Sequence, residues 1–261
     1  MPGRQRRGAS SGPPPSTALA RRVEVGEIVE RLGADDVGGG ERTRLIARLA
    51  AALAAGARAA GGRAVLTGRA LADAVSELAP SVPVRDLAAL RAAHGGLSGD
   101  ALADALVTTA TRTTAGIGAA GGALSAVQLA APPSLLAAPV QVAAETIAVV
   151  LVELKLVAEL HVVHGAVPPG GPAQQAAAYL TSWVGKRGLD LGPGGPGLSA
   201  VVATAARQQL RGRLVRRFGR NLSTLAPFLA GAVAGAELNR RETRSLGDAL
   251  RADLRRLTRR R

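Results

Sequence analysis

The chain has 261 residues and a formal net charge of +14, from 33 Lys and Arg against 19 Asp and Glu, and it contains no cysteine. The lack of cysteine excludes disulfides, thiolate metal sites and a thiol nucleophile. One Trp, one Tyr and two Phe are too few for the base-stacking surfaces of common RNA-binding domains.

The first 22 residues are predicted to form a disordered basic tail, because three arginines and a run of three prolines occur there without any acidic residue. No apolar run of the signal-peptide type follows, so we expect a cytoplasmic protein. Residues 23–98 are predicted to form an N-terminal helical region. Its apolar residues recur at helical spacing in four stretches, 23–32, 41–60, 64–79 and 84–93.

The central part of the chain contains no charged residue from Thr113 to Ala144, a run that Pro132 and Pro133 divide. Two apolar stretches separated by a proline pair are typical of an αα-hairpin, since proline cannot continue a helix. The sequence therefore predicts an all-α fold, a multi-helix bundle over 99–261 built around this central hairpin. Gly/Pro linkers are expected within the bundle at 165–172 and 185–197.

The second stretch of the hairpin carries several polar and charged residues. Gln141, Glu145, Lys155 and Glu159 fall within roughly a third of the circumference of a helix, which predicts a polar stripe on an amphipathic helix. A charged group in lipid costs about 2.5–3.5 kcal/mol on insertion scales. Three alternatives stay open: a buried hairpin, a re-entrant or membrane-apposed hairpin, and a double transmembrane span.

No pattern in the sequence indicates a catalytic, cofactor or metal site. Glu145, Glu153 and Glu159 lack the Glu-x-x-His spacing of a di-metal site. His161 and His164 lie near a predicted helix end, where cations interact favourably with the helix dipole. Residues 116–121 match GxGxxG, but helical sequence and not a strand precedes them, so we expect these glycines to allow close packing.

Two further features point to partners. Six arginines occur within 14 residues that contain no acid, and they predict contact with phosphates of a membrane surface or of nucleic acid. These are Arg207, Arg211, Arg213, Arg216, Arg217 and Arg220. Gly231 and Gly235 have the four-residue spacing that lets two helices approach closely, within the chain or between chains.

The C-terminal two-thirds of the chain resembles the EcsC family. The resemblance lies in a Gly/Ala-rich run (114–123), a proline turn, and an apolar helix that ends in His164-Gly165, where family members often have Tyr-Gly. A later apolar Pro/Gly segment is followed by Asn239, Thr243 and Gly247, as in the family's C-terminal pattern. The resemblance implies an all-helical, bacterial, membrane-associated or transport-accessory protein, and it implies no catalytic activity.

The sequence therefore predicts a non-catalytic protein at the cytoplasmic face of the cell membrane, with an accessory or interaction role. Its expected partners are an anionic membrane surface and either a helix-mediated protein partner or a second copy of the chain. The alternative is a soluble basic protein that associates non-specifically with nucleic acid.

Overall fold

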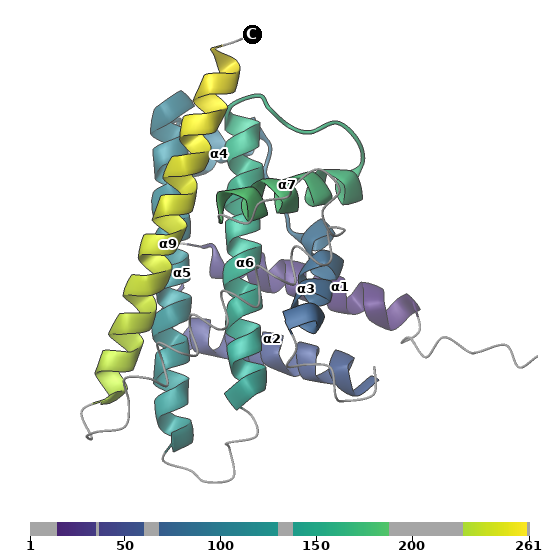
Figure 1. The fold of residues 1–261 in the computed structure, drawn as a ribbon, viewed down its shortest axis with the longest axis vertical. Coiled ribbons are helices and arrows are strands. Elements are labelled where there is room, and N and C mark those ends of the chain that lie inside the picture. The colour runs from purple at the N-terminus through teal and green to yellow at the C-terminus, as the bar shows by residue number, and fades with distance from the viewer. Residues whose placement is uncertain (1–14, 35–36, 60–67, 130–137, 188–226, 260–261) are drawn as a thin grey trace, which may run out of the picture.

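A computed structural model describes residues 15–34, 37–59, 68–129, 138–187 and 227–259 (Figure 1). These residues form eight α-helices and one short 3₁₀ helix, and no strand occurs among them, which confirms the all-α prediction. In chain order the elements are α1 (Pro15–Leu32), α2 (Gly39–Ala59), α3 (Gly68–Leu78), η1 (Ala79–Ser81), α4 (Leu87–Ala93), α5 (Gly99–Leu129), α6 (Ala138–Val163), α7 (Pro172–Lys186) and α9 (Pro227–Thr258).

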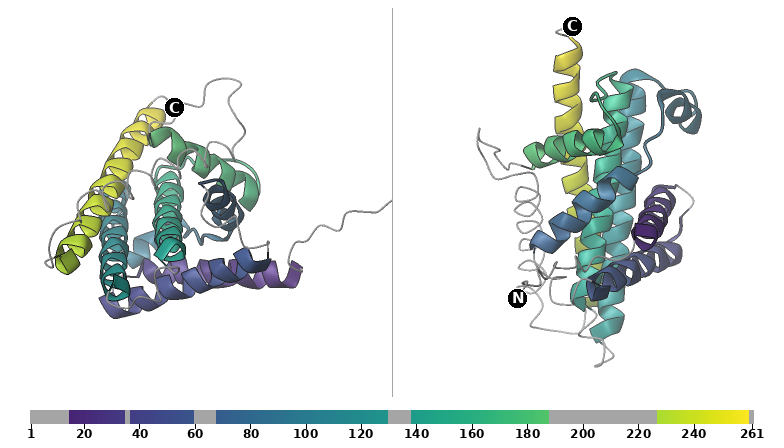
Figure 2. Two further views of the ribbon diagram at one scale, coloured as in Figure 1. Left: turned by 60° about the horizontal axis from the view of Figure 1, so that its bottom comes forward. Right: turned by 90° about the vertical axis from the view of Figure 1, so that its right-hand side faces the viewer.

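Helix α6 is the centre of the bundle. It packs against α5, the other helix of the predicted hairpin, and the two run in opposite directions (Figure 1). Helix α9 lies along α5, while α1 and α2 cross the bundle and α7 crosses α6 near its C-terminal end (Figure 2). Because α6 has neighbours on several sides, nearly all of its residues from Ala143 to Leu160 are buried.

The buried apolar residues form one continuous core. It extends from Val25 in α1 to Leu254 in α9, and Leu, Val, Ile and Ala supply most of it. Trp183 in α7 is the largest fully buried side chain. The predicted regions 23–98 and 99–261 therefore share a single core, in which Leu49 of α2 is as inaccessible as Leu151 of α6.

Two predicted boundaries were wrong. Helix α1 begins at Pro15, so residues 15–22 are helical and not part of a disordered tail. A proline suits the first turn of a helix because its missing N–H would have no helical partner there, and Arg21 is held by an ion pair of 2.6 Å to Glu77. Residues 1–14 lie outside the described residues.

The second wrong boundary is the linker predicted at 185–197. Helix α7 continues to Lys186, and Arg187 follows it into a buried ion pair; residues 188–197 lie outside the described part. The linker predicted at 165–172 agrees with the structure, since Gly165 has a φ of 62° just after α6 and α7 begins at Pro172. Glycine adopts this left-handed conformation without the steric cost that a Cβ atom brings.

Candidate functional site

The predicted polar stripe of α6 does not form a solvated face. The side chains of Glu145 and Glu159 are buried, and Glu153 between them is only 1% exposed. The helical wheel of α6 alone could not show this, because the covering comes from helices distant in sequence. Gln141 belongs to α6, but its side chain lies outside what the structure describes.

Glu153 is the centre of a buried polar cluster. Its Oε1 accepts hydrogen bonds from Arg187 (2.5 Å) and from the Thr243 hydroxyl (2.8 Å). Its Oε2 accepts a hydrogen bond from the indole Nε1 of Trp183 at 2.8 Å. A buried carboxylate is tolerated only when a cation and additional donors replace water, and here α7 and α9 provide them.

Arg187 connects this cluster to a second acid. Its guanidinium group lies 3.3 Å from Glu242 of α9 and 5.7 Å from the centre of the Trp183 ring. Burial alone would lower the pKa of Arg187, but the carboxylates of Glu153 and Glu242 outweigh it and raise the pKa above its ordinary value. The guanidinium group therefore stays charged and ties α7 to both α6 and α9.

The cluster continues into the contact between α5 and α9. The Thr114 hydroxyl donates to the hydroxyl of Thr243 at 2.9 Å, and Asn239 Nδ2 donates to the backbone oxygen of Thr114 at 2.9 Å. Thr114, Asn239 and Thr243 are all at most 4% exposed. Side chains from four helices thus share one connected set of hydrogen bonds.

Glu159 lies in a separate ion cluster towards the C-terminal end of α6. Arg85 makes two parallel hydrogen bonds to its carboxylate, of 2.9 and 3.0 Å. Lys155 lies 2.8 Å from the same carboxylate and also donates to the backbone oxygen of Pro83 at 2.6 Å. Bidentate Arg–carboxylate pairs are geometrically specific, so this cluster holds the segment before α4 against α6.

Glycines allow α5 to approach its neighbours closely. The carboxyl group of Glu145 lies directly against the backbone of Gly121, where a Cβ atom would overlap it. Gly118 faces Gly235 of α9, and a Cβ atom on Gly235 would lie 2.8 Å from the backbone oxygen of Gly118. The structure thus places one glycine of the predicted Gly231–Gly235 pair in a contact within the chain; Gly231 lies one turn earlier in α9.

Both predicted capping histidines bind the last turns of α6. Nδ1 of His161 lies 2.7 Å from the Val157 oxygen, and Nδ1 of His164 lies 2.8 Å from the Leu160 oxygen. Burial lowers the pKa of His161, the hydrogen bond to Val157 acts in the opposite direction, and His164 lowers it further. Neither histidine belongs to a group of three or more potential metal ligands within the described ranges.

The six arginines predicted to contact an anionic partner, Arg207 to Arg220, lie outside the described residues. Three described arginines of α9, Arg244, Arg251 and Arg255, pair with acids of α5. Arg251 lies 2.9 Å from Asp104 of α5, and Arg255 lies 2.7 Å from Asp100. Over the part of the chain that the structure describes, no helix is long and apolar enough to cross a membrane.

Comparison of the chain with protein-family models, curated proteins and solved structures found no match. The resemblance to the EcsC family therefore stays a prediction from the sequence. Of the positions that support it, Asn239 and Thr243 lie in the buried cluster and Gly247 packs against Val107 of α5.

Sequence reasoning named Thr243 only through the family resemblance, and it missed Trp183 and Arg187 as partners of Glu153. Arg187 was assigned to a linker, and the buried Thr114 was read only as part of an apolar run. One signal was present: Trp183 and Arg187 are four residues apart and so share a face of α7.

The arrangement is suited to holding helices together. Three donors already occupy the oxygens of Glu153, and two cations surround Glu159. A general base needs a lone pair directed at a substrate proton, and these donors compete for the lone pairs. We therefore assign both clusters a structural role.

Proposed function

We propose that the chain is a non-catalytic helical protein that binds an anionic membrane surface on the cytoplasmic side through its arginine-rich segment 207–220. The distribution of charge carries the proposal. Residues 188–226 contain six arginines and one acid, Asp190, which is a net charge of +5 in 39 residues. Each arginine that lies close to an anionic lipid surface contributes about 1 kcal/mol to binding.

The packing of α6 supports the arginine segment, and not the hairpin, as the part proposed to contact the membrane. The apolar side chains of α6 already contact other helices, as Ile147, Leu151 and Leu160 are each at most 1% exposed. Exposing them to lipid would remove the core that α1, α2 and α7 share with α6. Membership of the EcsC family, with its implied bacterial membrane-associated role, is part of the same proposal.

Vesicle co-sedimentation of the full chain tests the proposal. We expect binding to vesicles that contain phosphatidylglycerol, no binding to pure phosphatidylcholine, and a steep loss of binding as salt is raised. Replacing Arg211, Arg213, Arg216 and Arg217 by Gln should weaken binding by between about tenfold and about a thousandfold, since about 1 kcal/mol per arginine is an upper limit.

A matched control and a nucleic-acid arm make the test decisive. Arg240→Gln with Arg241→Gln changes two exposed arginines of α9, and it should leave vesicle binding nearly unchanged. The same proteins are titrated with duplex DNA at equal salt. Tighter binding to DNA than to anionic vesicles would replace the membrane proposal by the nucleic-acid alternative, and binding to neither would refute both.

A further inference from the structure

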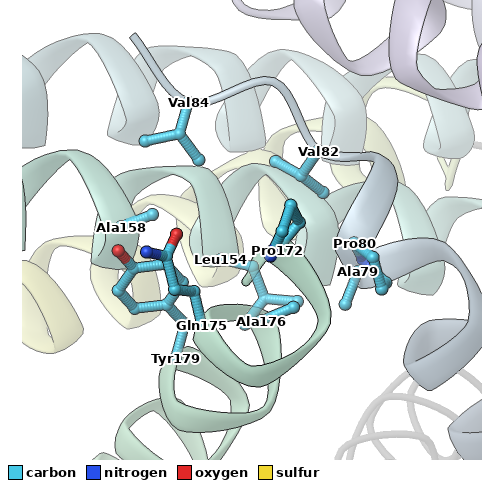
Figure 3. A pocket seen from close by; sticks show the side chains of 10 residues that line it. All are labelled: Ala79, Pro80, Val82, Val84, Leu154, Ala158, Pro172, Gln175, Ala176 and Tyr179. Carbon is cyan, nitrogen blue, oxygen red and sulfur yellow. The ribbon is translucent and has the colours of Figure 1, made fainter. Parts of the chain in front are cut away.

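A cavity of about 210 Å³ lies between the segment 79–84, α6 and α7 (Figure 3). Eight of its ten lining residues are Ala, Pro, Val or Leu; Leu154 and Ala158 contribute from α6 and Ala176 from α7. The other two, Gln175 and Tyr179, are polar but uncharged. The wall therefore favours an apolar molecule and offers no counter-charge to an ion.

Tyr179 brings a hydroxyl group to this cavity. The residue is 6% exposed, and no hydrogen bond of its hydroxyl lies within the described part of the chain. The hydroxyl is not among the buried atoms that lack a partner, so it is accessible to a small molecule in the cavity. Burial also raises the pKa of Tyr179, so the hydroxyl stays protonated and can donate.

Gln175 provides an acceptor one helical turn away. Its side-chain nitrogen donates to the backbone oxygens of Pro168 (3.2 Å) and Gly170 (3.1 Å), which fixes the orientation of the amide. Oε1 is then left as the acceptor. Residues 175 and 179 share a face of α7, and Figure 3 shows their side chains next to each other in the cavity wall.

We propose that this cavity is a binding site for a small neutral molecule with an apolar skeleton and one hydroxyl group, an alcohol or a phenol. The hydroxyl oxygen accepts a hydrogen bond from Tyr179, and its proton is donated to Gln175 Oε1. A carboxylate cannot donate to Gln175, and an ammonium group cannot accept from Tyr179. A cavity of about 150 Å³ in another protein binds benzene, so this one is large enough for a single substituted ring.

Titration of the full chain with benzyl alcohol, followed by ¹H–¹⁵N NMR, tests the site. We expect saturable shifts of amides in α7 and in residues 79–84, with a dissociation constant in the millimolar range because so small a ligand has few contacts. Toluene, which has the same ring without a hydroxyl group, should bind more weakly at the same amides. Benzoate should not bind there.

Tyr179→Phe separates the hydrogen bond from the apolar contact. This variant should bind benzyl alcohol about five- to tenfold more weakly, the equivalent of one neutral hydrogen bond, and should bind toluene as the unaltered protein does. Toluene binding also shows that the variant is folded. Thr181→Val removes a hydroxyl from the exposed part of α7 and should change neither affinity.

Three results would overturn the inference. They are equal affinity of Tyr179→Phe and the unaltered chain for benzyl alcohol, shifts spread over amides remote from α7, and no saturable shift at millimolar concentration. The inference is independent of the proposed membrane contact, since the cavity is remote in sequence from residues 207–220.

Discussion

At the scale of single residues, Glu153 and Arg187 carry the largest electrostatic consequence in the bundle. Removing one partner of a buried ion pair leaves an uncompensated charge, which costs about 3–5 kcal/mol, whereas replacing both by apolar residues is often nearly neutral. Glu153 is 1% exposed, and the side chain of Arg187 is 11% exposed. The pair therefore belongs to the buried class, in which the two cases differ strongly.

We predict that Arg187→Met lowers the free energy of unfolding by about 3 kcal/mol or more, because Glu153 then lacks its cation. The double variant Glu153→Leu with Arg187→Met should recover part of this loss, although Trp183 and Thr243 then lose their acceptor. Urea unfolding of the four proteins of the cycle measures both effects. Arg241→Met, which removes an exposed ion pair with Glu237, is the control and should have only a small effect. Additive losses in the double variant would contradict a buried, coupled pair.

His161 contributes a pH dependence to the stability of the bundle. Its pKa is lowered from 6.5 by burial, and its ring lies tilted at 58° to the ring of Tyr179, with 5.3 Å between the ring centres. The unfolded chain consequently binds a proton at higher pH than the folded chain does. The contribution of His161 to stability is complete above pH 6.5 and is lost as the pH falls through the lower, folded-state pKa.

We therefore predict that the urea midpoint decreases as the pH is lowered from about 7 to about 5, the range in which histidine titrates. His161→Gln should flatten this decrease, since glutamine does not ionise. Denaturation at a series of pH values measures it. An unchanged slope in the variant would show that other groups determine the pH dependence.

At the scale of elements, the sequence predicted the order of helices well, because apolar periodicity and the Pro/Gly breaks are local signals. It failed where long-range packing decides. Glu145 and Glu159 belong to one polar stripe on an isolated helix, and only the tertiary arrangement gives Glu159 the partner Arg85, 74 residues away. The start of α1 at Pro15 was missed since charge and proline suggested disorder, while the ion pair from Arg21 to Glu77 spans 56 residues.

The contact between α5 and α9 depends on glycine. A Cβ atom at Gly118 would overlap the backbone of Gly235, and backbone cannot move aside as a flexible side chain can. We predict that Gly118→Ala lowers the free energy of unfolding by about 1–3 kcal/mol, the usual cost of overpacking. Gly185→Ala is the matched control: no atom lies within 4 Å of the new Cβ. Its helical site should gain up to about 1 kcal/mol. Equal behaviour of the two variants in thermal or urea unfolding would contradict a close α5–α9 approach.

At the scale of the whole molecule, α6 makes the helices dependent on one another. The core cluster includes residues of α1, α2, α3, α5, α6, α7 and α9, so neither 23–98 nor 99–261 has a core separate from the other. The only tryptophan, Trp183, lies in α7. Helices α7 and α2 lie on opposite sides of α6 (Figure 2). The fluorescence of Trp183 therefore tests whether a change in the N-terminal region reaches the C-terminal one.

We predict that Leu49→Ala in α2 shifts the unfolding transition measured by Trp183 fluorescence as much as the one measured by far-UV circular dichroism. Leu49 is 0% exposed, and truncation of such a leucine costs about 2–5 kcal/mol. Because the core is shared, this cost should apply to the whole bundle, and the two probes should give coincident curves. Leu257→Ala, at a position that is 54% exposed, should move neither curve appreciably. A Trp183 transition that stays in place while the circular dichroism curve becomes biphasic would show that α1–α3 unfold separately from the helices around α6.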